Sequence, residues 1–194
     1  MTTSSRTYHH GDVPAALMRA ALELLEESGA TELSLRAAAR RAGLSTAAPY
    51  RHFSDRNALL SAVAAVGYRE LAEHLAAAQH GAPGPDQLAN IAVAYVRFAL
   101  ERPGLFRVMF AEGCDATSPD RVAAVAAITE YLNYVVQQTL PSSDPEAMAI
   151  AAWGLVHGLA FLHLDGKLDT SSSQAVADRV RGAVRAVLAL SAEG

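Results

Sequence analysis

The chain has 194 residues, of which 51% are hydrophobic, and its formal net charge is −4 at pH 7. This apolar fraction is sufficient for a substantial buried core, and the length suits one large domain or two small ones. Cys114 is the only cysteine, which excludes an intrachain disulfide and favours a reducing cytoplasm. Because residues 1–12 contain no apolar run, we expect no secretion signal.

The pattern of apolar residues predicts an all-α protein with about nine helices. Ala, Leu, Arg and Glu dominate the composition, and strand-like alternation is almost absent. Gly and Pro residues separate the segments in which apolar side chains recur at helical spacing. The expected helices cover residues 12–29, 35–42, 45–53, 54–79, 87–101, 105–110, 120–140, 145–164 and 174–190. Ser54 is the expected cap of the fourth of these helices, and Asp86 that of the fifth. Residues 1–11 are expected to be a flexible tail.

The stretch from Ser34 to Asn57 is expected to fold as two short helices joined by a tight turn. The Ser34 hydroxyl can accept a backbone N–H bond at the start of the first helix, and Ser45 can do the same for the second. Gly43 supplies the left-handed residue that often ends a helix. This order of elements predicts a helix-turn-helix, which places its second helix in the DNA major groove.

Positive charge is concentrated in the same stretch. Residues 34–56 contain five arginines and one aspartate, which gives a net charge of +4. The whole chain carries −4, so the residues outside this stretch sum to −8. A local basic patch on an acidic protein is expected where only one part of the molecule contacts nucleic-acid phosphates. These arginines are Arg36, Arg40, Arg41, Arg51 and Arg56.

Several motifs in this region resemble the TetR/AcrR family of transcriptional regulators. They are Gly43-Leu44-Ser45, Tyr50-Arg51-His52-Phe53, Asp55-Arg56 and Leu59-Leu60. Residues 12–63 carry this resemblance, and Trp153 to Gly158 is similar to the Trp-x-x-x-His-Gly motif of one C-terminal domain type of the family. The resemblance implies a homodimeric repressor that binds a palindromic operator. It also implies that a small-molecule effector binds the C-terminal domain and releases the DNA.

The resemblance implies two domains joined by the long fourth helix over residues 54–79. Residues 1–56 are expected to form the helix-turn-helix domain, and residues 57–194 a ligand-binding and dimerisation domain. No catalytic arrangement, glycine-rich phosphate loop or set of metal ligands is recognisable, so we expect neither an enzyme nor a metal or cofactor. The alternative is a small-molecule binding protein or enzyme whose helix-turn-helix is vestigial.

The second helix of the motif is predicted to run from Thr46 to Phe53. Pro49 removes one helical N–H bond and disfavours helical geometry at Ala48, so an irregular first turn is expected. Helical spacing directs one set of side chains towards the groove and another set inward. The groove-facing set is Thr46, Ala47, Tyr50 and Arg51, and the inward set is Ala48, Pro49 and Phe53.

The DNA contacts expected of these residues differ in kind. Thr46 or Ala47 can meet a thymine methyl group, and Arg51 can hydrogen-bond guanine. By resemblance to the family, Tyr50, His52 and Arg56 contact the DNA backbone. The complete set of predicted DNA-binding residues is Ser34, Arg36, Ser45, Thr46, Ala47, Tyr50, Arg51, His52 and Arg56.

An effector pocket in the C-terminal domain is a further implication of the resemblance. Aromatic and methionine side chains with a few polar groups line such pockets, although the same residues at helical spacing are also typical of plain core. The candidate ligand-binding residues are Tyr95, Phe106, Met109, Phe110, Tyr131, Trp153 and His157.

The last two helices are the predicted dimer interface. Residues 147–164 contain no charged residue and reach the lower length limit of a membrane span. Acidic residues at both flanks, with no basic side, make a membrane helix the less favoured interpretation. A helix that packs both on its own core and on another subunit has the same composition. We therefore expect a four-helix interface between two copies.

Overall fold

The computed structural model describes residues 13–110, 114–140 and 144–192. These residues form eight α-helices and two 3-10 helices and contain no strand, in agreement with the predicted all-α fold. The elements are α1 (Val13–Ser28), η1 (Ala30–Glu32), α2 (Leu35–Arg41), η2 (Ala48–Arg51), α3 (Arg56–Ala77), α4 (Pro85–Glu101), α5 (Pro103–Phe110), α6 (Pro119–Thr139), α7 (Pro145–Leu164) and α8 (Ser173–Ala192). The tail predicted over residues 1–11 lies outside the described residues.

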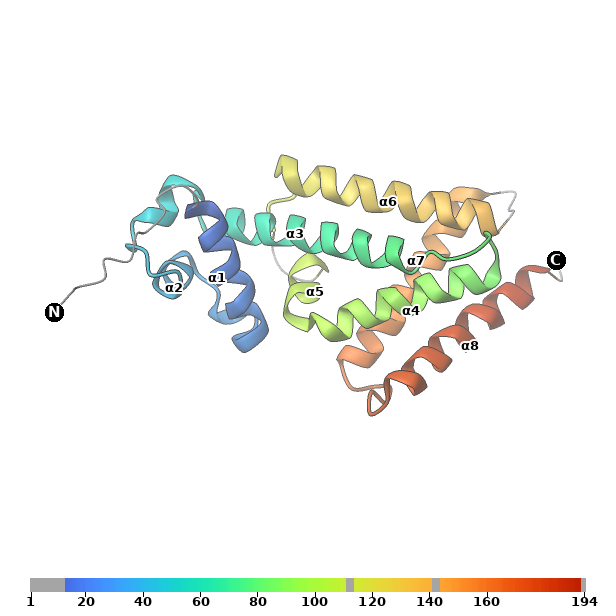
Figure 1. Cartoon of the computed structure of the whole chain (residues 1–194). Helices are drawn as coiled ribbons and strands as arrows, with labels where there is room; N and C mark the ends of the chain where they lie inside the picture. Colours follow the sequence, from blue (N-terminus) through green and yellow to red (C-terminus); the bar gives the residue numbers. More distant parts are fainter. Residues whose placement is uncertain (1–12, 111–113, 141–143, 193–194) are drawn as a thin grey trace.

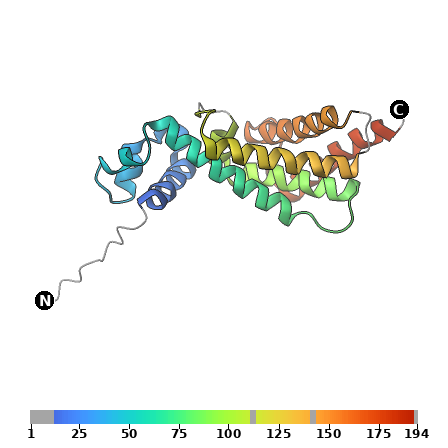
Figure 2. The same ribbon diagram turned by 90° about the horizontal axis from the view of Figure 1, so that it is seen from above.

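The molecule is elongated, with a small head at one end and a larger helical body at the other (Figures 1 and 2). The head consists of α1, η1, α2 and η2, and the body of α4 to α8. α3 begins beside the head and continues into the body, where it packs against α5 and α6. This helix is therefore the main connection between the two parts.

Buried side chains along α3 belong to one hydrophobic core that extends through both parts. Leu59 and Leu60, near the start of α3, are fully buried in this core together with Leu17 of α1. Further along, the Tyr68 hydroxyl donates a hydrogen bond of 2.9 Å to the backbone carbonyl of Met109 in α5. Side chains of α3 are therefore buried in both the head and the body. Because packed protein interiors deform little, α3 is a rigid link between the two parts.

Side-chain caps fix where the helices begin. The Asp55 carboxylate accepts the Ala58 N–H at 2.8 Å, so Asp55 caps α3 in place of the predicted Ser54. Asp144 caps α7 in the same way. α4 begins at Pro85, which puts the predicted cap Asp86 inside the first turn. There its negative charge still favours the positive end of the helix dipole.

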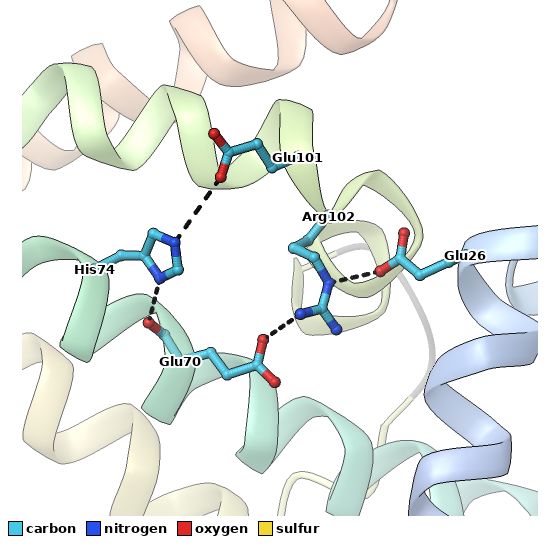
Figure 3. A network of polar contacts seen from close by, with 5 residues as sticks. All are labelled: Glu26, Glu70, His74, Glu101 and Arg102. Carbon is cyan, nitrogen blue, oxygen red and sulfur yellow. Dashed lines mark hydrogen bonds and ion pairs between the residues drawn. The ribbon is translucent and has the colours of Figure 1, made fainter.

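A polar network joins the head, α3 and the end of α4 (Figure 3). Arg102, the residue that follows α4, donates a hydrogen bond of 2.7 Å to the Glu70 carboxylate of α3 and a second one to Glu26 of α1. His74, one turn beyond Glu70, lies 3.9 Å from the Glu101 carboxylate. Three helices therefore meet at one charged cluster between head and body.

Candidate nucleic-acid interface and ligand cavity

α2 is capped at its start and ends in a glycine turn, as predicted. Ser34 Oγ accepts the backbone N–H of the residue three positions on, at 3.1 Å. Gly43 has a φ of +69°, and its N–H donates to the Arg40 carbonyl at 3.2 Å. The Leu44 N–H donates to the Ala39 carbonyl at 2.9 Å. Together these bonds form a Schellman motif, which turns the chain sharply away from the axis of α2.

The second helix of the motif is shorter than the predicted Thr46–Phe53. The chain instead makes a turn and then the single 3-10 helix η2. Pro49 has no N–H, so it cannot make the α-helical bond to the Ser45 carbonyl. The Ala48 N–H makes the tighter 3-10 bond to that carbonyl, at 3.0 Å. The irregularity expected at Pro49 is confirmed, but the side-chain cap predicted for Ser45 is wrong, because the N-cap position is Ala47.

The exposure of the side chains in this segment matches the predicted facing. All four residues predicted to face the groove are exposed, and 52% of the Tyr50 surface is accessible. Pro49 is buried, and Ala48 and Phe53, the other inward-facing residues, are half-buried. A short 3-10 turn therefore presents the same side chains that a longer helix would present. Their contact with DNA stays a prediction.

Arg41 is paired within the protein, although it contributes to the basic stretch. Its guanidinium forms an ion pair with Glu23 of α1 at 3.3 Å and a bidentate pair with Glu27 of the same helix. The hydrogen bond from Arg41 lowers the pKa of the Glu27 carboxyl below its usual value. The positive charge of Arg41 is thus largely compensated on the side of α2 that faces α1.

Arg56, the first residue of α3, is half-buried and also bonded within the head. Its Nε donates to the Leu33 carbonyl at 2.9 Å, and its Nη2 donates to the Ala30 carbonyl at 2.7 Å. These two bonds fix the short η1 segment against the start of α3. Any phosphate contact by Arg56, which stays a prediction, would have to use its remaining N–H groups.

The other residues predicted to bind DNA differ in their accessibility. Arg36, Arg40 and Arg51 are exposed and form no salt bridge within the described part of the chain. Ser45 and His52 are exposed as well. Ser34 is half-buried, and its hydroxyl already serves as the cap of α2.

An apolar cavity of about 60 Å³ lies in the body between α4, α6, α7 and α8. Among the described residues that line it, only Tyr95 and Trp153 carry polar side-chain groups, and none is charged. Aliphatic and methionine side chains form the rest of the wall, among them Ile91, Leu132, Val136, Met148, Val156 and Val184.

The two polar groups of the wall are already hydrogen-bonded. Trp153 Nε1 donates to the Tyr95 hydroxyl at 3.2 Å, and the same hydroxyl lies 3.0 Å from His157 Nδ1. The His157 ring packs against Phe110 and Phe161, with ring centroids 4.6 Å and 4.9 Å away. Burial raises the pKa of Tyr95 and lowers the pKa of His157. Both side chains are therefore neutral near pH 7.

Of the seven predicted ligand-binding residues, only Tyr95 and Trp153 line the cavity. His157 contacts Tyr95 from behind the wall. Phe106 and Met109 are fully buried. The remaining two make contacts elsewhere: the Phe110 ring packs at a tilt against Phe106, and the Tyr131 hydroxyl donates to Gln79 Oε1 at 3.3 Å. Core packing, the alternative left open by the sequence, accounts for the position of these residues.

Two protein-family models match the chain and decide its family. Residues 17–63 match the model of bacterial regulatory proteins of the tetR family, and residues 88–187 match that of a tetracyclin repressor-like C-terminal domain. The chain belongs to the TetR family. Its helix-turn-helix is therefore the DNA-binding element of a TetR-family transcriptional regulator.

Solved structures of TetR-like fold match nearly the whole chain. A Rhodococcus sp. RHA1 protein of unknown function is 31% identical, with a TM-score of 0.78, over 93% of this chain and 97% of that one. A tetR-family regulatory protein from Rhodococcus RHA1 is 24% identical, with a TM-score of 0.64, and the match covers 88% of this chain and 94% of that chain. The TetR-family regulator PfmR from Thermus thermophilus is 20% identical, with a TM-score of 0.63, and the match covers 87% of this chain and 96% of that chain. A comparison of this sequence with curated proteins found no match.

Most of the cavity wall of this TetR-family chain was not identifiable from the sequence. Residues such as Leu132 and Val136 follow helical spacing, and this spacing predicts a buried side chain whether or not a cavity lies beside it. Tyr95 and Trp153 were the only wall residues that their chemistry singled out. Likewise, no local pattern signals that Arg41 pairs with α1.

α7 leaves much of its apolar surface uncovered in the single TetR-family chain. By length and composition alone, this helix could cross a membrane, because it contains an 18-residue stretch with a mean hydropathy of 1.6. Only 22% of that stretch is buried inside the single chain. Ile150 is 62% exposed and Leu162 is 44% exposed. A Cβ atom added at Gly154 or Gly158 would meet no atom within 4 Å. A contiguous exposed apolar face is typical of an interaction surface.

Proposed function

We propose that the protein is a cytoplasmic, homodimeric transcriptional repressor that releases a palindromic operator when a small molecule binds its body. One observation carries the DNA-binding role. The exposed segment from Thr46 to His52 follows the glycine turn of α2, within a stretch of charge +4 in a chain of charge −4. Membership of the TetR family supports the same role.

The proposed domains divide the two tasks. Residues 1–56 carry the DNA interface, and residues 57–194 carry the ligand cavity and the subunit interface. α3 starts at this boundary, with Arg56 bonded to the head and the rest of the helix packed in the body. A change in the direction of α3 would therefore reposition the DNA interface.

The exposed residues of the DNA interface have proposed contacts of three kinds. Arg51 hydrogen-bonds a guanine edge in the major groove, and Thr46 or Ala47 packs against a thymine methyl group. Tyr50 and His52 bind phosphate oxygens and set the register of the head on the duplex. The exposed Arg36 adds positive charge nearby, which strengthens binding to any DNA sequence.

The proposed dimer forms through α7 and α8. The uncovered face of α7 includes Ile150, Gly154, Gly158 and Leu162, which recur every four residues along one side of the helix. Gly182 of α8 also has open space where a Cβ would lie. The lack of side chains there lets a second pair of helices approach closely. Family membership favours this use of α7 over the membrane alternative.

Effector release is proposed to act through α4, which forms part of the cavity wall and ends beside the head. Tyr95 lies in this wall, while Arg102, just after the helix, bonds Glu26 of α1. A ligand that binds more tightly to the arrangement unable to bind DNA shifts the population towards that arrangement. The two recognition segments of the dimer would then no longer match the half-site spacing of the operator.

Operator binding tests this proposal, with DNA from upstream of the protein's own gene as the target. Wild-type protein should bind this DNA more tightly than unrelated DNA of equal length, with an affinity that falls as salt rises. Tyr50→Ala should weaken binding, and Arg51→Gln should also reduce the preference for the operator by about 1–3 kcal/mol. Fluorescence anisotropy at several salt concentrations measures both effects.

Arg69→Gln is the matched control, because Arg69 is exposed in the middle of α3 and outside the basic stretch. It should bind the operator as the wild type does. Equal binding by wild type, Tyr50→Ala and Arg51→Gln would show that the exposed turn is not the DNA interface. Ligand binding without any DNA binding would instead favour the alternative, a small-molecule binding protein with a vestigial helix-turn-helix, which the cavity also supports.

A further inference from the structure

We infer that the effector is an uncharged, largely aliphatic and slender molecule with at most one hydrogen-bonding group. This inference names the ligand class of the proposed effector site. The inference follows from the wall chemistry, the volume and the mouth of the cavity between α4, α6, α7 and α8.

The chemistry of the wall excludes a charged ligand group inside the cavity. No Asp, Glu, Lys, Arg, Asn or Gln is among the described residues that line it. A charged group that leaves water for an apolar environment without a partner loses several kcal/mol of hydration free energy. His157, which contacts Tyr95 from behind the wall, is neutral near pH 7 because burial lowers its pKa.

The wall offers one hydrogen-bonding point. The Trp153 N–H is already used by the Tyr95 hydroxyl, which in turn contacts His157 Nδ1. A hydroxyl group has one donor and two acceptor sites, so the Tyr95 oxygen retains the capacity for one further bond. A ligand hydroxyl can be matched there with either tautomer of His157, because it can donate or accept, whereas any second polar group would lose its bonds to water.

The small volume and the mouth of the cavity favour a chain over a broad ring system. Its volume is about 60 Å³, well below the volume of about 150 Å³ of a cavity that holds benzene, so a ring does not fit and a chain would enter by one end with the rest of it in the mouth. The exposed residues of the lining are Ala151 of α7 and Val187 of α8, so the entrance is apolar too. A charged headgroup left at the entrance would therefore find no partner among the lining residues.

The single tryptophan of the chain gives a direct signal for this test. Trp153 is the only tryptophan and lines the cavity, so ligand entry should change its fluorescence. Three probes with the same alkyl chain separate the ligand classes: neutral 1-decanol, anionic decanoate and cationic decylammonium, each below its micelle concentration at pH 7.5. Decanol should give a saturable change, and each ion should bind at least tenfold more weakly.

Two cavity-filling variants and one control locate the binding. Ala152→Leu on α7 and Ala92→Val on α4 add apolar bulk to two of the lining helices and should each abolish or strongly weaken decanol binding. Ala126→Leu adds the same bulk to the exposed face of α6 and should bind decanol as the wild type does. Circular dichroism establishes that each variant is folded. If one of the two cavity-filling variants does not fold, the other still tests the inference.

Three results would overturn the inference. They are no saturable signal with decanol, an ion that binds as tightly as decanol, and unchanged binding in both folded cavity-filling variants. Operator binding is measured on the same samples without probe, so the two proposals fail separately. If the protein binds decanol but not the operator, the repressor role alone is refuted. If it binds the operator but not decanol, the ligand class alone is refuted.

Discussion

Arg102, just after α4, donates a hydrogen bond of 2.9 Å from its Nε to the Glu26 carboxylate of α1. The same guanidinium bonds Glu70 of α3, so one side chain connects the head to both the linking helix and the body. The backbones are also close at this point, because a Cβ atom at Gly104 would collide with the Leu25 carbonyl oxygen. Head and body therefore meet through direct contacts besides α3.

Replacing Arg102 should weaken the joint between head and body. Arg102 and its two partners are each about one-third exposed, so these bonds are better shielded than those of a fully exposed pair. We expect Arg102→Met to lower the free energy of unfolding by about 1–2 kcal/mol. Urea unfolding followed by circular dichroism measures the change.

Arg185→Met is the control for this variant. Arg185 pairs with Asp86, but the Asp86 side chain is 88% exposed, so loss of the pair should change stability by less than about 0.5 kcal/mol. An equal loss in both variants would show that the bonds of Arg102 contribute no more than a surface ion pair.

The proposed dimer predicts an effect of bulk on the uncovered face of α7. Gly158→Leu adds a side chain where the single chain has open space, so it should fold normally but obstruct the close approach of a second copy. We expect the dissociation constant of the dimer to rise by about 5-fold to 160-fold, since overpacking of an interface costs about 1–3 kcal/mol. Sedimentation equilibrium measures the dissociation constant.

The same substitution on another exposed surface separates obstruction from added hydrophobicity. Ala123→Leu lies on the exposed face of α6, away from the proposed interface, and should leave the dimer unchanged. A dimer of wild-type affinity in Gly158→Leu would rule out α7 as the interface.

The burial of His157 predicts that stability falls in mild acid. Desolvation lowers the pKa of His157 in the folded chain below its usual value, so the unfolded chain binds the proton more readily. The free energy of unfolding should therefore be unaffected by this group above about pH 6.5 and should fall as the pH drops below it. His157→Phe keeps an aromatic ring and removes the titration, so it should show a smaller fall.

Thermal unfolding between pH 7.5 and 5.5 checks this difference. His80→Gln is the control, because His80 is exposed in the segment after α3 and should leave the wild-type pH dependence intact. A steeper or unchanged fall in His157→Phe would mean that another group is responsible.

Local signals were enough to predict the order of the helices and the helix-turn-helix. Gly43, the cap at Ser34 and the missing N–H of Pro49 act over only a few residues, so their consequences follow from the sequence. Family motifs then indicated the correct family. The choice between Ser54 and Asp55 as the cap of α3 failed because both neighbours have suitable side chains.

Contacts between distant residues were not predictable. Arg102 and Glu26 are 76 residues apart, and Arg41 and Glu27 lie on different helices, so no periodic pattern connects them. The cavity wall was missed for a related reason. An aliphatic side chain such as Val136 gives the same signal in a filled core as beside a gap, and only the packing of four helices decides which occurs.

Arg56 and Arg51, two arginines of the basic stretch, should respond differently to the same substitution. Arg56→Gln removes two hydrogen bonds to half-buried carbonyls, so it should lower the free energy of unfolding by about 2 kcal/mol. Arg51 is exposed and has no ion-pair partner in the described residues, so Arg51→Gln should change stability by less than about 0.5 kcal/mol.

The DNA-binding assay should give the opposite ranking at a temperature where both variants are folded. Arg51→Gln should lose operator preference, because its proposed partner is a base edge. Arg56→Gln should retain that preference, since its bonds hold η1 against α3 and sequence reading rests on other residues. If Arg56→Gln is as stable as the wild type and only its salt dependence is reduced, then Arg56 is chiefly a phosphate contact and its bonds to the carbonyls are incidental.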